Sequence, residues 1–487
     1  MTLTRTEQAI GALAFAGDLS MGQPPDHSPN VARLAARLAD SAGADADMQA
    51  TAARLAMLRW AGCTSNAREF AMLFGDDVGG RAAYIEGRNP FVATEPPNPA
   101  SLHDTMVPIA AAHCEAVVMI CQRLGLPDVL IHAAEDFFEN WDGSGLPEGK
   151  AGDAIHEAAQ YVALAGDIEV YGRNFGTARA TLLIENRAGK VYDPSLAQIA
   201  IQHMDRWLKA EAPGDACAAA LACCALGDDD VSLSDVALLL ADYSDLKRPD
   251  MTGVSRLAQG LSLKMAEAAT QDPDEISAIG FAAALADLGQ VAVPNPAFDH
   301  GTGTSEAARL APHWTERILS RAPDLLAVAR LASLAYERMD GSGFNRGLTA
   351  AAQPFEARIV QVARLATVER MAHGLRAEWP VAHLRALLTA EAKAGRLDLR
   401  AVRLALEAMG ARNLPRAEEE PVLSLTAREQ DVLAGLIAGQ SNKEIARGLE
   451  LSPKTVGTHV EKIFRKLGVS SRAAAAMKAL DAGLVAP

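Results

Sequence analysis

Hydrophobic residues recur along this chain at helical spacing, and no stretch of any length alternates apolar and polar residues as a half-buried strand does. Between residues 453 and 467 the apolar positions fall on one face of a helix; they are Val456, Val460, Ile463, Phe464 and Leu467. Aromatic residues make up only 5% of the chain. The pattern predicts an all-α protein.

Three helix starts can be located near the C-terminal end. Thr426 with Glu429, and Ser441 with Glu444, have the spacing of a capping box, in which each side chain bonds the other residue's backbone amide. Ser452 precedes a proline, which favours a helix that begins directly after it. Three helices are therefore expected between residues 426 and 467.

The remaining chain contains an internal repeat. Residues 139–145 read ENWDGSG and residues 337–343 read ERMDGSG, an offset of 198. Upstream the offset is 227, which relates DHS at 26–28 to GVS at 253–255, and LRWAG at 58–62 to LADLG at 285–289. The first copy therefore holds about 29 extra residues. We expect this insertion, residues 64–100, to be turn-rich and on the surface, because it contains GDDVGG and NPFVATEPPNP.

These observations divide the chain into four parts. Two helical repeats are predicted at residues 1–230 and 231–415, a charged linker at 416–422, and a C-terminal domain at 423–487. We find no signal peptide and no apolar run of about 18 residues, the length that a membrane span needs. A cytoplasmic protein without a membrane partner is expected.

Charge separates the last domain from the rest. Residues 423–487 hold nine Lys/Arg and six Asp/Glu, a net of +3, whereas the whole chain carries −15, so residues 1–422 carry −18. The polar face of the helix at 453–467, with one lysine of the preceding helix, suits base edges and phosphates in a DNA major groove. The predicted DNA-binding residues are Lys443, Lys454, Thr455, Thr458, His459, Lys462 and Lys466.

The same segment resembles the LuxR-type helix-turn-helix family. The motifs that carry the resemblance are LTARE at 425–429, SNKEIA at 441–446, SPKTVGTH at 452–459 and KLGVSSR at 466–472. The resemblance implies a four-helix domain that binds double-stranded DNA as a homodimer. It further implies that the third helix reads the groove and that the fourth, after Ser471, lies near the dimer contact.

The two repeats resemble HD-GYP domains, a family of helical metal-dependent phosphohydrolases that act on cyclic di-GMP. DGSG at 340–343 followed by the helix PFEARIVQVA at 354–363 carries this resemblance. Of the metal-ligand positions that the family implies, only His27 and His113 in the first copy and Asp287 in the second keep a ligand residue. The others hold non-ligand residues, namely Arg59, Trp60, Phe137, Phe138 and Gly166 in the first copy, and Val254, Ala286, Ala311, Ala335, Tyr336 and Arg364 in the second. We therefore expect no bound metal or other cofactor, and no enzymatic activity.

The signature loops are expected to be structural. Asp142 and Asp340 would cap the loops, and Gly143, Gly145, Gly341 and Gly343 would permit positive φ angles. Arg364, which stands at a former ligand position, either binds an anion in the emptied site or forms a surface salt bridge with Glu369 or Glu337.

Together the residues favour a DNA-binding transcriptional regulator whose non-catalytic repeats dimerise the protein or sense an unknown small-molecule effector. Two alternatives stay open. One is a cyclic-dinucleotide phosphohydrolase fused to a DNA-binding domain, and the other is an adaptor whose repeats bind a partner protein while the last domain localises it on DNA.

Overall fold

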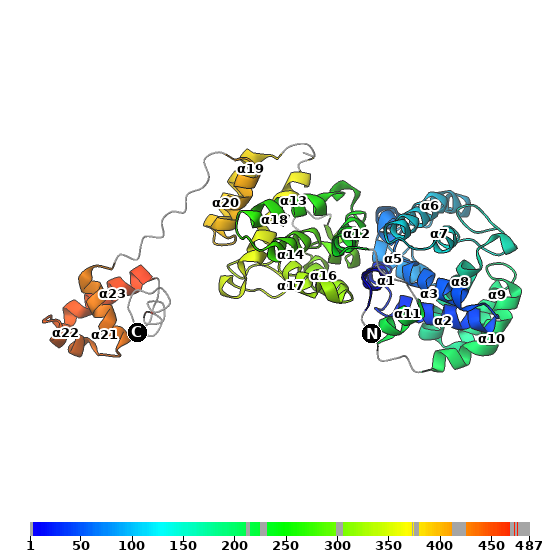
Figure 1. Cartoon of the computed structure of the whole chain (residues 1–487), viewed down its shortest axis with the longest axis horizontal. Coiled ribbons are helices and arrows are strands. Elements are labelled where there is room, and N and C mark those ends of the chain that lie inside the picture. Colours follow the sequence, from blue (N-terminus) through cyan, green and yellow to red (C-terminus); the bar gives the residue numbers. More distant parts are fainter. Residues whose placement is uncertain are drawn as a thin grey trace. The chain divides into compact units, whose positions relative to one another are not determined.

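The computed structural model of the chain is helical throughout the residues it describes, which are 3–210, 215–224, 231–298, 305–372, 374, 379–411, 425–467, 472 and 475. It forms two compact units, Met1–Leu414 and Pro415–Pro487 (Figure 1). Only isolated β-bridges occur among these residues. The prediction of an all-α fold is confirmed.

The first half of the larger unit consists of helices whose connections differ in length. They are α1 (Arg5–Ser20), α2 (His27–Ser41), α3 (Ala46–Leu58), α4 (Ala67–Phe74), α5 (Asp77–Ile85), α6 (Pro99–Arg123), α7 (Asp128–Glu135), α8 (Glu157–Phe175), α9 (Thr177–Arg187), α10 (Pro194–Lys209) and α11 (Ala216–Cys224). The connections range from a few residues to the long loops between α5 and α6 and between α7 and α8. Helix α2 packs against α3 and α8. Apolar residues of these helices form the core of this half.

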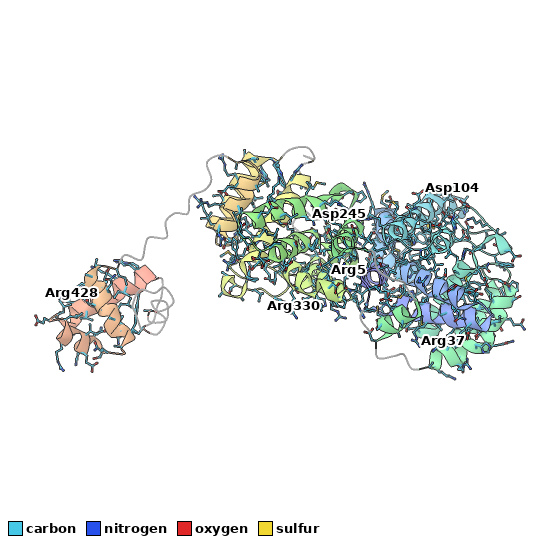
Figure 2. All side chains as sticks on the ribbon, viewed as in Figure 1. Arg5, Arg37, Asp104, Asp245, Arg330 and Arg428 are labelled. Atoms are coloured by element: carbon cyan, nitrogen blue, oxygen red, sulfur yellow. The ribbon has the colours of Figure 1, made fainter. Side chains whose placement is uncertain are left out.

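The second half repeats this order. Its helices are α12 (Leu233–Asp245), α13 (Val254–Glu267), α14 (Pro273–Ala284), α15 (Glu306–Arg309), α16 (Ala311–Leu319), α17 (Leu326–Ala332), α18 (Phe355–Ala372), α19 (Val381–Lys393) and α20 (Leu399–Ala408). The helices α12, α13, α14 and α18 correspond to α1, α2, α3 and α8. Figure 2 shows the side chains that the helices of both halves carry.

One hydrogen-bond pattern shows the repeat at the level of atoms. The carboxylate of Asp18 accepts from the backbone amide and the hydroxyl of Ser28. Asp245 accepts in the same way from Ser255. Each pair fastens the first helix of its half to the start of the second. The 227-residue offset read from the sequence therefore relates equivalent contacts.

The insertion differs from its prediction. It is not merely turn-rich surface, because α4 and α5 form within it and their side chains Phe70, Phe74 and Arg81 are buried. The polar run GDDVGG begins a helix because Asp76 accepts from the amides of Val78 and Gly79 as its N-cap.

A buried ion pair joins the insertion to the second half. Lys247 Nζ lies 2.6 Å from Asp77 Oδ2, and the two side chains are 1% and 0% exposed. The other carboxylate oxygen of Asp77 accepts from the backbone amide of Asn295. Helix α1 packs against α12 and α16 of the second half as well as against α2 and α3. The two repeats thus share one continuous hydrophobic core.

The C-terminal unit contains α21 (Ala427–Ile437), α22 (Asn442–Gly448) and α23 (Pro453–Leu467). Both predicted capping boxes are confirmed, at Thr426 with Glu429 and at Ser441 with Glu444. The amide of Thr455 donates to Ser452 Oγ over 3.1 Å, which caps α23. The charged linker and the predicted fourth helix lie outside the described residues.

Two helices of the larger unit are long and apolar enough to cross a membrane by length and composition alone. They cover Ala100–Arg123 and Pro273–Ala292, and 39% and 56% of their apolar windows are buried inside the fold. We expected no uninterrupted apolar run of that length, but mean hydropathy selects both segments. The core helix of a helical unit satisfies the same criterion, so the two are weak evidence for a membrane span.

Candidate functional site

The described residues of the C-terminal unit present an exposed polar face on α23. Val456, Val460 and Ile463 are buried against α21 and α22. The opposite face carries exposed side chains, together with one lysine at the start of α22; they are Lys443, Lys454, Thr455, Thr458 and Lys462. Amphipathic packing thus leaves lysines and hydroxyls facing outward, the groups that contact phosphates and base edges.

Two residues predicted for this face have other surroundings. Lys466 Nζ lies 2.6 Å from Glu429 Oε2, and this ion pair lowers the pKa of Glu429 to about 2. This ion pair links the end of α23 to the capping box of α21, so the exposed Lys466 already has an internal partner, and its contact with DNA stays a prediction. His459 is partly buried, and its Nδ1 atom is buried without a hydrogen-bond partner among the described residues.

In the first half, the two retained histidines do not converge on a common point. His27 Nδ1 lies 2.6 Å from Glu169 Oε2, and both side chains are buried. His113 Nε2 donates to the backbone carbonyl of Arg59 over 2.7 Å. Burial lowers the pKa of His113 to about 3, so its imidazole is neutral at physiological pH. Trp60 stands between the two rings, with its centroid 6.5 Å from His27 and 6.3 Å from His113.

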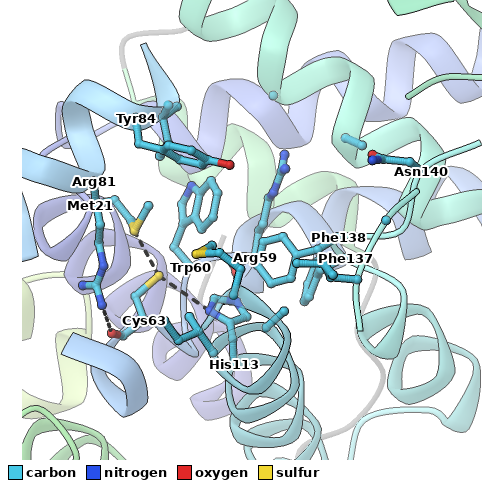
Figure 3. A pocket seen from close by; sticks show the side chains of 18 of the residues that line it. Met21, Arg59, Trp60, Cys63, Arg81, Tyr84, His113, Phe137, Phe138 and Asn140 are labelled. Carbon is cyan, nitrogen blue, oxygen red and sulfur yellow. Dashed lines mark hydrogen bonds between the residues drawn. The ribbon is translucent and has the colours of Figure 1, made fainter. Parts of the chain in front are cut away.

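A cavity of about 660 Å³ opens beside these histidines (Figure 3). Eight aromatic side chains line it: Trp60, Phe70, Phe74, Tyr84, Phe91, Phe137, Phe138 and Tyr192. Four of these residues (Phe70, Phe74, Tyr84 and Phe91) come from the insertion. No sequence pattern indicated this contribution, because the apolar residues of the insertion are scattered among turn-forming ones.

Three arginines contribute to the wall of this cavity, and one of them, Arg187, is paired with Asp167. Arg59 Nη1 donates to the carbonyl of Val162 over 3.1 Å, and Arg81 Nη2 donates to the carbonyl of Cys63 over 2.8 Å. Within the described part of the chain, the Nε atoms of Arg59 and Arg81 are buried without a hydrogen-bond partner, and neither of these two guanidinium groups has a carboxylate at salt-bridge distance. Arg81 was not predicted from the sequence, and Arg59 was predicted only as the replacement of a metal ligand.

The corresponding place in the second half is closed by a polar network. Arg364 Nε donates to Asp287 Oδ1 over 2.7 Å, and the guanidinium carbon lies 3.6 Å from the centroid of the Tyr336 ring. The Tyr336 hydroxyl donates to the same carboxylate oxygen and accepts from Gln290 Nε2 over 2.9 Å. The expected salt-bridge partner of Arg364 is therefore wrong, because it pairs with the retained Asp287 and not with Glu369 or Glu337.

The two signature loops have matching geometry. Asp142 accepts from the amide of Ser144, and Asp340 from the amide of Ser342, each over 2.9 Å. Gly143 and Gly341 have φ angles of +82° and +79°.

The other two loop glycines differ from the expectation. Gly145 and Gly343 do not adopt positive φ. A Cβ atom at either would instead overlap the preceding backbone, at Asn140 and at Arg338. Glu139 and Glu337, for which no such role was predicted, accept from backbone amides across each loop and hold it in place.

The donor set does not fit a metal ion. Among the described residues no three His, Cys, Asp or Glu side chains come together in a group that could hold one. The retained candidates are engaged elsewhere: His27 with Glu169, His113 with a backbone carbonyl, and Asp287 with Arg364.

Comparison with known proteins identifies both parts. Residues 423–479 match the bacterial regulatory proteins of the luxR family, and residues 239–384 match the HD domain. The chain is 23% identical over 402 residues to 3′3′-cGAMP-specific phosphodiesterase 3 of Vibrio cholerae. This match covers 76% of this chain and 87% of that protein. A crystal structure of a cyclic GMP-AMP specific phosphodiesterase from V. cholerae has a similar fold, with a TM-score of 0.57 and 20% identity over 85% of this chain and 98% of that one.

The C-terminal unit has closer relatives. It is 52% identical over 59 residues to the nitrate/nitrite response regulator protein NarP of Escherichia coli, and 44% identical over 66 residues to the putative regulator YhjB of the same organism. These matches span 27% and 33% of the two regulators, so only their DNA-binding ends are shared.

The expectation that the protein is not an enzyme is contradicted by the similarity to a phosphodiesterase over 76% of the chain. That expectation rested only on the missing metal-ligand residues. The first half nevertheless has a large cavity beside the two retained histidines. The similarity does not identify catalytic residues. The chain carries a luxR-family helix-turn-helix domain at its C-terminal end and an HD domain upstream, and it is a DNA-binding transcriptional regulator.

Proposed function

We propose that this regulator acts in the cytoplasm, that it binds promoter DNA as a homodimer through α23, and that residues 1–414 control this binding in response to a small-molecule effector. The observation that carries the DNA contact is the exposed face of Lys454, Thr455, Thr458 and Lys462 on α23. Its positive charge stands against −18 on residues 1–422, so phosphates are attracted to one end of the chain and repelled by the rest.

The test is salt-dependent binding of the full chain to promoter fragments obtained by mapping its genomic sites. Lys454→Ala plus Lys462→Ala removes two phosphate-seeking charges. We expect weaker binding, and a plot of log affinity against log salt that is shallower by about one unit for each phosphate that the variant no longer neutralises. The matched control is Lys209→Ala plus Lys264→Ala, which removes two exposed lysines of the larger unit.

Equal loss of affinity in the control pair would contradict an α23 interface, because the effect would then follow net charge alone. The homodimer is tested separately by the molar mass of the free and DNA-bound protein in light scattering. A dimer on DNA predicts two half-sites about one helical turn apart, roughly 34 Å. Monomeric protein on a single half-site would contradict this part of the proposal.

A second candidate function is hydrolysis of a cyclic dinucleotide, supported by the similarity to the 3′3′-cGAMP-specific enzyme over 76% of the chain. Turnover of 3′3′-cGAMP, measured by chromatography with Mg²⁺, Mn²⁺ or Fe²⁺ present, tests it. Turnover that is lost in Arg59→Gln would establish the activity in the first half. No turnover under any of these conditions would remove this candidate and leave the regulatory function untouched.

A further inference from the structure

The cavity of the first half has the dimensions of a small-molecule site. Its volume of about 660 Å³ lies within the range of roughly 300–1,000 Å³ typical of ligand pockets. Tyr84 and His103 are exposed among the lining residues and mark its solvent side, whereas Trp60, Phe74 and Phe137 are buried.

The wall favours a flat ring system. The Phe138 ring centroid lies 4.9 Å from His113, and the Phe74 and Phe91 centroids are 5.2 Å apart, both in edge-to-face arrangements. Aromatic side chains arranged around an open space offer ring faces and edges to a planar guest. The β-branched residues among the described lining residues are Ile85, Ile109, Val170 and Val191.

Arg59 gives the cavity a positive charge. Its guanidinium carbon lies 4.7 Å from the centroid of the Trp60 ring, and Figure 3 shows its side chain between Trp60 and Phe138. Burial lowers the pKa of Arg59, and the nearby Asp167 carboxylate offsets only part of this effect. Its buried Nε–H has no acceptor within the described residues. A polar group that is buried without a partner is costly, so an acceptor placed in the cavity beside the Arg59 Nε atom would be stabilised.

The carboxylates around the cavity do not supply that acceptor. Asp167 is engaged by Arg187 and by the Tyr192 hydroxyl. Glu139 accepts from the amides of Glu148 and Gly149 in the signature loop. Arg81, which is 1% exposed, adds a second guanidinium that is bonded to neutral groups alone among the described residues.

At the corresponding place in the second half, the arginine is paired with a carboxylate. There Asp287 neutralises Arg364, and Tyr336 covers the guanidinium. The residues that correspond to Asp287 and Arg364 in the first half are Trp60 and Gly166. The first half therefore has an arginine at this place without a carboxylate at salt-bridge distance, because the neighbouring Asp167 is paired with Arg187.

We infer that the cavity of the first half binds a flat aromatic molecule that carries one acidic group, with its rings among Trp60 and Phe138 and its acid on Arg59. This inference rests on the proposed function, because it specifies the chemistry of the small-molecule effector. The acid is a carboxylate or a phosphate ester, since a guanidinium pairs with either through two parallel hydrogen bonds.

Calorimetric titration of the full chain tests the inference with matched probes. 1-Naphthoate is compared with neutral 1-naphthamide, and GMP with guanosine, so that the two pairs distinguish a carboxylate from a phosphate source. We expect at least one acid to bind at least tenfold more tightly than its neutral partner. Arg59→Gln should remove that preference and leave the affinity for the neutral partner within about twofold.

Two further variants keep the result interpretable. Arg330→Gln removes an exposed arginine of the second half and should change nothing (Figure 2). Ala163→Phe fills the cavity from α8 and should abolish binding of acid and neutral probe alike, with thermal unfolding showing that the variant is folded.

The inference is overturned if acid and neutral probes bind equally, if neither acid binds, or if Ala163→Phe binds like the wild type. DNA binding is measured on the same variants without any probe. If the lysine variants lose DNA binding but no probe binds the chain, only the inferred ligand is rejected. If the probes bind as expected but never change the affinity for DNA, only the proposed regulation is rejected.

Discussion

The two halves of residues 1–414 have the same helical order but opposite interiors at the same place. In the first half, aromatic side chains surround an open cavity with an arginine that has no carboxylate partner among the described residues. In the second half, Asp287, Tyr336 and Arg364 form a hydrogen-bonded network at the corresponding place. Repetition of a fold therefore preserves its frame and its loops, whereas a few substitutions decide whether the interior is a binding site or part of the core.

The insertion makes the comparison possible, because it supplies one wall of the cavity and is anchored in the second half through Lys247 and Asp77. Lys247→Met leaves the Asp77 carboxylate buried without its cation. We expect the free energy of unfolding of this unit to fall by about 3–5 kcal/mol, measured in urea. The double variant Lys247→Met plus Asp77→Leu should recover part of this loss. A loss below about 1 kcal/mol for the single variant would show that the insertion is anchored elsewhere.

Removing one charge from each interior gives the sharpest contrast between the halves. Asp287→Ala leaves Arg364 without its partner, and we expect a loss of about 3 kcal/mol in the free energy of unfolding. Arg59→Gln removes a cation that has no carboxylate partner among the described residues, so without ligand it should cost less than about 0.5 kcal/mol or stabilise the fold. Denaturant titrations of both variants measure this. Equal losses would mean that the two interiors are charge-balanced to the same degree.

One titrating feature is common to both halves. Burial raises the pKa of Asp18 to about 7 and that of Asp245 to about 6, so the folded state binds protons that the unfolded state releases above about pH 4. Their contribution to stability is present below about pH 4 and is lost as the pH rises through about 6 and 7. The variant Asp18→Asn plus Asp245→Asn should therefore gain stability relative to the wild type between about pH 4 and 7. Thermal unfolding across that range measures the difference.

If the difference in stability between the wild type and the Asp18→Asn plus Asp245→Asn variant did not change with pH, the raised pKa values of these two carboxyl groups would be contradicted. His113, which only the first half has, contributes in the opposite direction between about pH 3 and 6.5, because it is neutral when folded. Its contribution is the same in the wild type and in the variant, so it does not affect the comparison.

The smallest expected effect concerns the loops, in which the two halves agree. Gly143→Ala and Gly341→Ala force alanine into positive φ, which costs about 1–2 kcal/mol at each position. We expect equal losses in urea titrations. Gly145→Ala and Gly343→Ala should each cost more, because their added methyl groups overlap backbone atoms. Unequal losses at Gly143 and Gly341 would show that the two loops are not equivalent.

Local sequence patterns predicted much of this molecule. The helical fold, the repeat offsets, the capping boxes and the outward lysines of α23 depend on spacing and on contacts within a few residues, which a sequence displays directly. The same reasoning failed for the insertion and for the salt-bridge partner of Arg364. Each of these depends on a partner distant in sequence, as in the separation of 77 positions between Arg364 and Asp287.

The sequence by itself determined which helices form, that the chain repeats, and that one end has a face suited to DNA. Only the tertiary structure decided which residues meet. It brought the aromatic residues of the insertion to the wall of the cavity, and among the described residues it left Arg59 there without a carboxylate at salt-bridge distance. It also paired Arg364 with Asp287 in the other half. The physical reason is that burial and charge pairing depend on contacts between distant segments, and packing, rather than local spacing, decides these contacts.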